Sequence, residues 1–227
     1  MTRGIFISGN DSLLCAAIAA QAARRVERFA QVLLPNRLSG QARGPLPDYS
    51  PAAEPGAGVI PLVWNPGSPI SARTLVLAAT HQLERIDEAV LVCSPPSFRR
   101  PAAELQPLDI EVLVNDHIKG WFFLVRELAG IFRARRSGVL SLVAPDPGSA
   151  RDDQADLLGL PAAAAFRAFA QGLLASSAAE PYVTLGFISQ ETGDDDNFAA
   201  YIFRLIDQAS KRNSGKWHKY GRLNIFK

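Results

Sequence analysis

The sequence has few cysteines, no long hydrophobic run and little excess charge of either sign. Its two cysteines, Cys15 and Cys93, are too few and too far apart for a disulfide framework or a zinc site, so we expect both to be buried as small apolar side chains. No run approaches the roughly 18 apolar residues that span a bilayer, and the first residues lack the apolar stretch of a signal peptide. We therefore expect a cytoplasmic protein without a membrane segment.

The near balance of charge argues against a nucleic-acid partner. The formal net charge is +2, whereas nucleic-acid binding needs basic residues concentrated on one surface. The segment from Lys211 to Lys227 is the one place that raises the question, because it has no acidic residue and contains Trp217 and Tyr220. We interpret this segment as solvated and docked on the core through its aromatic residues. A tail that contacts phosphate groups is the alternative.

The composition is typical of a globular protein, with 48% hydrophobic and 20% charged residues. A chain of 227 residues buries one sizeable core, and α/β folds of this size are commonly single domains. We expect one domain over residues 1–227.

Short apolar runs alternate with helical patterns along the chain. The predicted strands are residues 4–8, 30–34, 59–64, 88–93, 139–144, 182–188 and 222–226. The predicted helices are residues 13–29, 71–85, 118–132, 162–175 and 197–211. Dense glycine and proline between Leu38 and Gly58 predict a long loop. The alternation predicts an α/β fold with a doubly wound parallel sheet, whose ligands bind at the carboxyl ends of the strands.

Four stretches resemble the short-chain dehydrogenase/reductase (SDR) family in order and spacing. They are Ile5-Phe6-Ile7-Ser8-Gly9, His117-Ile118-Lys119-Gly120 with the strand near Val139, Ala163-Ala164-Ala165-Phe166-Arg167, and Asn213-Ser214-Gly215. The resemblance covers nearly the whole chain. It implies a Rossmann-like, three-layer α/β/α domain and NAD(P)-dependent oxidoreductase chemistry.

The cofactor motif of that family is mostly missing. In its Thr-Gly-x-x-x-Gly-x-Gly turn, glycines let the backbone approach the pyrophosphate, but here only Gly9 remains, with Leu13 and Cys15 at the later positions. Asp11 adds a negative charge near the expected phosphate position. The cofactor-binding residues that the resemblance implies are Gly9, Asn10, Arg37 and Ser94, of which Arg37 would favour NADP. We expect no cofactor, or NADP or NAD if the chain is an active oxidoreductase.

The catalytic set implied by the resemblance is missing as well. The family's serine falls near Ala144 or Pro145, its tyrosine at Gly159, its lysine at Ala163 and its asparagine at His117. Loss of a general acid alone costs roughly 10²- to 10⁴-fold in rate. His117 is the one remaining catalytic candidate, because histidine titrates near neutrality. A packed or capping histidine is the alternative interpretation.

Two further clusters have mainly structural interpretations. Asp194, Asp195 and Asp196 precede a predicted helix, where carboxylates complement the helix dipole, and we expect no metal site there. Cys15 and Cys93 would flank one crevice if the first and fourth strands are neighbours, which leaves a thiol pair as an open alternative.

We expect a degenerate SDR-like protein, catalytically inactive, that acts as a scaffold, binding or regulatory protein. The alternatives are an NAD(P)-dependent short-chain oxidoreductase with a remodelled site and a binder of another small ligand. Helix 118–132 has apolar residues on two adjoining stripes, so we expect Trp121 or its counterparts to face outward. The sequence thus predicts a homo-oligomer, dimer or tetramer, paired through helices 118–132 and 162–175. An unidentified protein partner is a further alternative.

Overall fold

The computed structural model describes residues 3–10, 12–26, 28–34, 58–93, 95, 98–144, 156–189 and 193–221. Two of the predicted cofactor residues, Arg37 and Ser94, lie outside these ranges. So do Asp11, Pro145, the predicted strand 222–226 and nearly all of the predicted loop. The backbone of Asn10 is described, but its side chain is not.

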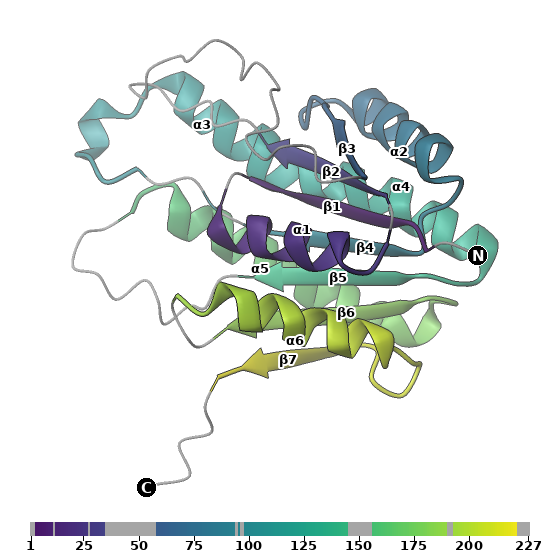
Figure 1. The fold of residues 1–227 in the computed structure, drawn as a ribbon. Coiled ribbons are helices and arrows are strands. Elements are labelled where there is room, and N and C mark those ends of the chain that lie inside the picture. The colour runs from purple at the N-terminus through teal and green to yellow at the C-terminus, as the bar shows by residue number, and fades with distance from the viewer. Residues whose placement is uncertain are drawn as a thin grey trace, which may run out of the picture.

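Seven parallel strands form one sheet in the order β3-β2-β1-β4-β5-β6-β7 (Figure 1). Their bounds are β1 Ile5–Asn10, β2 Phe29–Leu34, β3 Val59–Leu62, β4 Glu88–Val92, β5 Val139–Ala144, β6 Val183–Ser189 and β7 Lys216–Tyr220. The predicted doubly wound sheet is confirmed. The chain reverses its direction of travel across the sheet between β1 and β4, so the crevice of this fold lies at their carboxyl ends.

Helices cover both faces of the sheet. Their bounds are α1 Leu13–Ala23, α2 Pro69–Leu83, α3 Pro107–Val114, α4 Gly120–Arg135, α5 Gly159–Ser176 and α6 Asp195–Asp207. α1 and α6 pack on one face, in front of the sheet in Figure 1, and their buried residues include Ile18, Phe198 and Phe203. α2, α4 and α5 pack on the other face around Trp121 and Phe166. The arrangement is the three-layer α/β/α fold that the resemblance implies.

The last strand of the described residues, β7 at Lys216–Tyr220, was not predicted, and the predicted strand 222–226 lies outside those residues. Trp217 fixes β7, because its ring packs beside Gly186 of β6 and its Nε1 donates a hydrogen bond to Gln171 Oε1 at 2.8 Å. Tyr220 packs on Phe198 of α6 with ring centroids 5.4 Å apart. These aromatic residues dock the basic segment on the core, as predicted, and they do so as an edge strand.

Helix α4 differs from the prediction in which side chains face outward. Trp121 is only 1% exposed and packs edge-on against Phe166, with ring centroids 5.1 Å apart. Phe122 is instead 51% exposed. Of the two adjoining apolar stripes, the one with Trp121, Leu124 and Leu128 packs on the sheet, so Phe122 of the other stripe, and not Trp121, faces outward.

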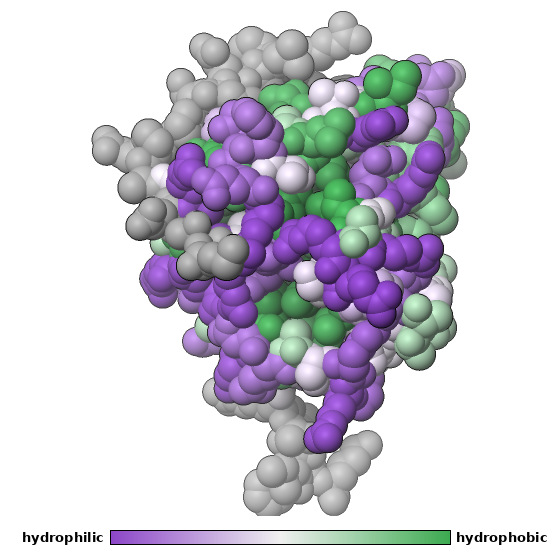
Figure 2. Space-filling model, turned by 90° about the vertical axis from the view of Figure 1, so that its right-hand side faces the viewer, coloured by the Kyte–Doolittle hydropathy of each residue, from purple (hydrophilic) through white to green (hydrophobic). Residues whose placement is uncertain are grey.

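Ion pairs link four segments at the amino ends of the strands. Arg3 contacts Glu88 Oε1 at 3.1 Å and Asp207 Oδ1 at 2.8 Å, and Arg25 also pairs with Asp207. Beside them, Asp87 accepts a hydrogen bond from the Gly4 N–H at 3.0 Å. Figure 2 shows this edge of the molecule, where hydrophilic side chains form a band across the surface. These ion pairs tie the segments at this edge together, whereas ligands of this fold class are expected at the opposite edge.

Candidate ligand crevice

Ser12 and Cys15 hold the described part of the turn between β1 and α1. Ser12 caps α1, accepting a hydrogen bond from the Cys15 N–H at 3.2 Å. A Cβ added to Gly9 would lie 3.0 Å from Cys15 Sγ and 3.1 Å from Val92 Cβ. Cys15 is 1% exposed, so its thiol fills the space above Gly9. Gly9 is therefore required for the close packing of α1 on β1.

The same turn does not fit the glycine cradle of the family that the sequence resembles. Leu13 is the first residue of α1 and is 81% exposed, so a large apolar side chain stands where that cradle has a glycine. Cys15 places a second side chain at the next glycine position. A pyrophosphate bound in the family's manner would need both positions to lack a side chain. The described residues at this turn thus disagree with an implied dinucleotide.

The carboxyl end of β5 and the start of α5 carry no described acid or base at the expected catalytic positions. Ala144 is buried at the end of β5, Gly159 is the buried first residue of α5, and Ala163 follows one turn later. Tyr182 lies at the amino end of β6, where it packs on Phe132. The other described tyrosines lie on α6 and β7. Among the described residues, the positions where the resemblance places the serine, tyrosine and lysine thus carry none of those side chains.

His117 lies in a π-helical turn, Asn115–Lys119, between α3 and α4. It is 6% exposed, and burial lowers its pKa to about 4, so the imidazole is neutral at pH 7. Its Nδ1 has no hydrogen-bond partner among the described residues. Helix α5 runs beside this turn. π-Helical turns occur frequently at functional sites, and a buried orphan nitrogen calls for a ligand or a water.

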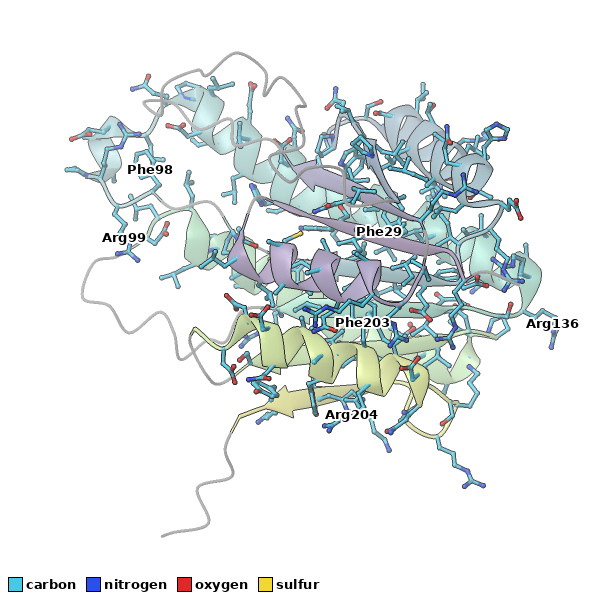
Figure 3. All side chains as sticks on the ribbon, in the orientation of Figure 1. Phe29, Phe98, Arg99, Arg136, Phe203 and Arg204 are labelled. Carbon is cyan, nitrogen blue, oxygen red and sulfur yellow. The ribbon has the colours of Figure 1, made fainter. Side chains whose placement is uncertain are left out.

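Helix α3 and the segment before it were missed in the sequence. Asp109 is fully buried and its Oδ2 accepts a hydrogen bond from the Gln106 N–H at 3.1 Å, which with Pro107 starts the helix. Phe98, Val112 and Leu158 form a small core cluster of their own. Figure 3 shows Phe98 beyond the carboxyl ends of the strands. The pattern Gln-Pro-x-Asp at residues 106–109 is the signal that predicts this helix.

The structure does not bring the two cysteines together as a thiol pair. Cys15 and Cys93 belong to core clusters on opposite faces of the sheet, so a thiol pair is wrong even though β1 and β4 are neighbours. Burial also raises the pKa of the Cys93 thiol to about 12.

Asp195 and Asp196 lie in the first turn of α6, as predicted. Within the described ranges no cluster of three metal-ligating side chains forms, and none of the helices there is long and apolar enough to cross a membrane.

Comparisons with known proteins support the fold and not a specific activity. No family model matches the sequence, and no curated protein matches it. Solved structures do match. A short-chain dehydrogenase from Rhodopseudomonas palustris is 16% identical with a TM-score of 0.70, over 97% of this chain and 99% of that one. Levodione reductase is 14% identical with a TM-score of 0.72, over 96% and 95%.

A third similar structure contains a nucleotide. It is the NADH-dependent reductase A1-R′ complexed with NAD, 12% identical with a TM-score of 0.71, over 96% of this chain and 94% of that one. The similarity to these three proteins spans nearly the whole length of each chain. This chain therefore has the fold of the short-chain dehydrogenases/reductases, as its sequence predicts.

Proposed function

We propose that this chain is a divergent short-chain dehydrogenase/reductase that has kept the scaffold and the crevice at the carboxyl ends of β1, β4 and β5, and that works there by binding. In this proposal the family's tyrosine–lysine acid–base chemistry is absent, and the protein acts as a binding or regulatory protein. The single observation that carries the proposal is the start of α5. Gly159 and Ala163 stand there, and neither residue has a side chain that exchanges a proton.

The turn between β1 and α1 supports the same proposal. Leu13 and Cys15 both put side chains where the family's glycines admit a pyrophosphate, and the Cys15 thiol is packed against Gly9. Opening this space for a dinucleotide would mean displacing a fully buried side chain from a close-packed core. Binding of a dinucleotide in the family's manner is therefore disfavoured.

Melting the purified protein with and without NADH and NADPH tests this proposal. A ligand present at about 100 times its Kd stabilises a protein by about 2.7 kcal/mol, which raises the Tm of a domain of this size by several degrees. We expect no rise in Tm with either dinucleotide at millimolar concentration. A rise of several degrees with one of them would contradict the proposal and favour the second candidate.

The second candidate is an NAD(P)-dependent short-chain oxidoreductase with a remodelled site. The comparisons favour it more directly than they favour the first, because the similar structures include reductases and one is complexed with NAD. The specific observation in its favour is His117, a neutral imidazole with an orphan Nδ1 in a turn that lies beside α5. In this candidate His117 holds or donates the proton that the family's tyrosine otherwise supplies.

A pair of histidine variants separates the two candidates. If the chain is an oxidoreductase, oxidation of NADH or NADPH with a panel of carbonyl compounds falls by roughly 10²-fold or more in His117→Ala. His81 lies on the exposed side of α2, so His81→Ala is the matched control and should not change the rate. If the unmodified protein does not oxidise NADH or NADPH with any of these carbonyl compounds, the result favours the first candidate, a binding protein.

A further inference from the structure

The Asp156 carboxylate anchors part of the segment between β4 and α4. Asp156, just before α5, accepts three backbone hydrogen bonds at one oxygen, Oδ1. The donors are Phe98 N at 3.0 Å, Leu158 N at 3.2 Å and Gly159 N at 2.7 Å. The Phe98 carbonyl in turn accepts a hydrogen bond from the Leu157 N–H at 3.2 Å. Asp156 thus fastens the segment that follows β4 to the start of α5.

The core behind this anchor is small and separate. Its buried residues, Phe98, Val112 and Leu158, are 2%, 6% and 2% exposed, and they belong to neither of the two large clusters on the sheet. The Arg100 guanidinium covers the Phe98 ring at 4.5 Å from its centroid. Satellite clusters of this kind open locally at a lower free energy than the main core. Residues 98–114 therefore have the features of a segment that opens locally while the rest of the domain stays folded.

The unit ends in a natural hinge next to a buried polar group. The π-helical turn Asn115–Lys119 joins α3 to α4, and such turns interrupt the regular hydrogen-bond ladder of a helix. His117 lies in this turn, 6% exposed, with its Nδ1 unpartnered among the described residues. Figure 3 shows Phe98 beyond the carboxyl ends of the strands, and Asp156 is hydrogen-bonded to the Phe98 N–H.

We propose that residues 98–114 form a lid over the crevice, latched by Asp156 to the start of α5, and that opening the lid exposes His117 as the polar anchor for the bound ligand. The ligand class is a small molecule with an uncharged hydrogen-bonding group, such as a carbonyl or a hydroxyl, because the anchor is a neutral imidazole. The proposal rests on the proposed binding function for its purpose. Its test requires no ligand and is independent of that function.

Acylation by diethyl pyrocarbonate reports access to the histidines, because the reagent acylates neutral imidazole nitrogen. The chain has only three histidines, and peptide mass spectrometry separates His81, His117 and His218. His81 on α2 is exposed and is the internal standard. In the unmodified protein we expect His117 to react much more slowly than His81. Equal rates for the two residues would overturn the lid.

Asp156→Ala removes the latch and leaves the lid's own residues intact. Hydrogen bonds to a charged group are strong enough that losing them should raise the rate at His117 at least about tenfold, with the rate at His81 unchanged. Asp196→Ala, at an exposed first-turn position of α6, is the matched control and should leave His117 protected. An unchanged rate at His117 in a folded Asp156→Ala protein would overturn the proposal.

Hydrogen exchange of the unmodified protein decides the matter if Asp156→Ala fails to fold. The proposal requires the amides of Phe98 and of α3 to exchange together, and faster than the amides of α4 between Leu124 and Phe132. Exchange of α3 as slow as that of α4 would mean that the segment opens only with the whole domain. That result would also overturn the lid.

Discussion

At the scale of single residues, Gly9 has a different role here from the one its motif suggests. In the resemblance it is the first glycine of a phosphate-binding turn, but in the structure it is the position over which Cys15 Sγ packs. Val92 bounds the same space from β4. A glycine kept for packing and a glycine kept for a ligand look the same in a sequence. Only the position of the Cys15 side chain distinguishes the two roles.

Packing at Gly9 predicts a coupled effect on stability. Gly9→Ala should lower the free energy of unfolding by about 1–3 kcal/mol, because the new Cβ meets Cys15 and Val92 in a close-packed core. In a Cys15→Ala background this loss should shrink by about 0.5 kcal/mol or more, since the Sγ that clashes is gone. Urea denaturation measures both values. Gly67→Ala, whose Cβ would have no neighbour closer than 3.4 Å, is the control and should destabilise much less.

Additive losses in the double variant would contradict this account of Gly9. They would mean that the added methyl group clashes only with Val92 and the backbone. The Cys15 thiol would then not be the reason that a glycine is needed at position 9.

At the scale of elements, regular periodicity was sufficient to predict most of the sheet and its helices. The strand Val139–Ala144 matches its prediction to the residue. Helix α3 was missed because it is short and its apolar stripe is interrupted. The π-helical turn after it also shifts the helical register between α3 and α4. The strand β7 was not predicted because its alternation is carried by Trp217 and Tyr220 among lysines, a pattern that also suits a solvated tail. Contacts with Gln171 of α5 and Phe198 of α6 determine it.

The site was predicted less well than the fold. The missing catalytic side chains at Gly159 and Ala163 could be read from the sequence, because a glycine and an alanine offer no chemistry wherever they lie. The Asp156 anchor could not, since a lone aspartate in a polar stretch has no local signal for a partner 58 residues away. The satellite core around Phe98 likewise depends on long-range contacts.

Two carboxylates among the ion pairs at the amino ends of the strands, Asp207 and Glu88, should contribute to stability with opposite dependence on pH. The Arg25 hydrogen bond holds the pKa of Asp207 below its usual value, so its contribution to stability is present above about pH 3.9 and is lost as the pH falls. Burial raises the pKa of Glu88. Its contribution is present below about pH 4.3 and is lost as the pH rises through the raised pKa.

Melting curves of two variants between pH 3 and 7 check these signs. The Tm of Glu88→Gln relative to the unmodified protein should increase as the pH rises. The Tm deficit of Asp207→Asn should be largest near pH 7 and should shrink as the pH falls. If the Tm differences of both variants changed in the same direction with pH, the opposite pKa shifts assigned to Glu88 and Asp207 would be contradicted.

At the scale of the whole molecule, we propose that two copies pair through α4 and α5. Phe122 on α4 is 51% exposed and stacks on Phe169 of α5, with ring centroids 4.1 Å apart. Gly130 and Gly172 on the same two helices have open space where a Cβ would stand, so a partner helix can approach closely. An apolar pair flanked by small residues suits a two-fold, self-complementary contact.

Size measurement in solution tests the dimer. We expect a particle of about twice 24.5 kDa at micromolar concentration, and a monomer for Phe122→Glu. Leu77→Glu, on α2 and 58% exposed, is the matched control and should remain dimeric. A particle near 24.5 kDa for the unmodified chain would refute the pairing.

Calorimetric titration of the unmodified protein with NADPH and NADH tests the central claim most directly. The claim is that this SDR-type scaffold has lost the family's dinucleotide cradle, because Leu13 and Cys15 occupy the turn after β1. The account predicts no saturable heat with either dinucleotide up to millimolar concentration. Saturable one-to-one binding with a micromolar Kd, weakened by a bulkier residue in place of Leu13, would contradict it.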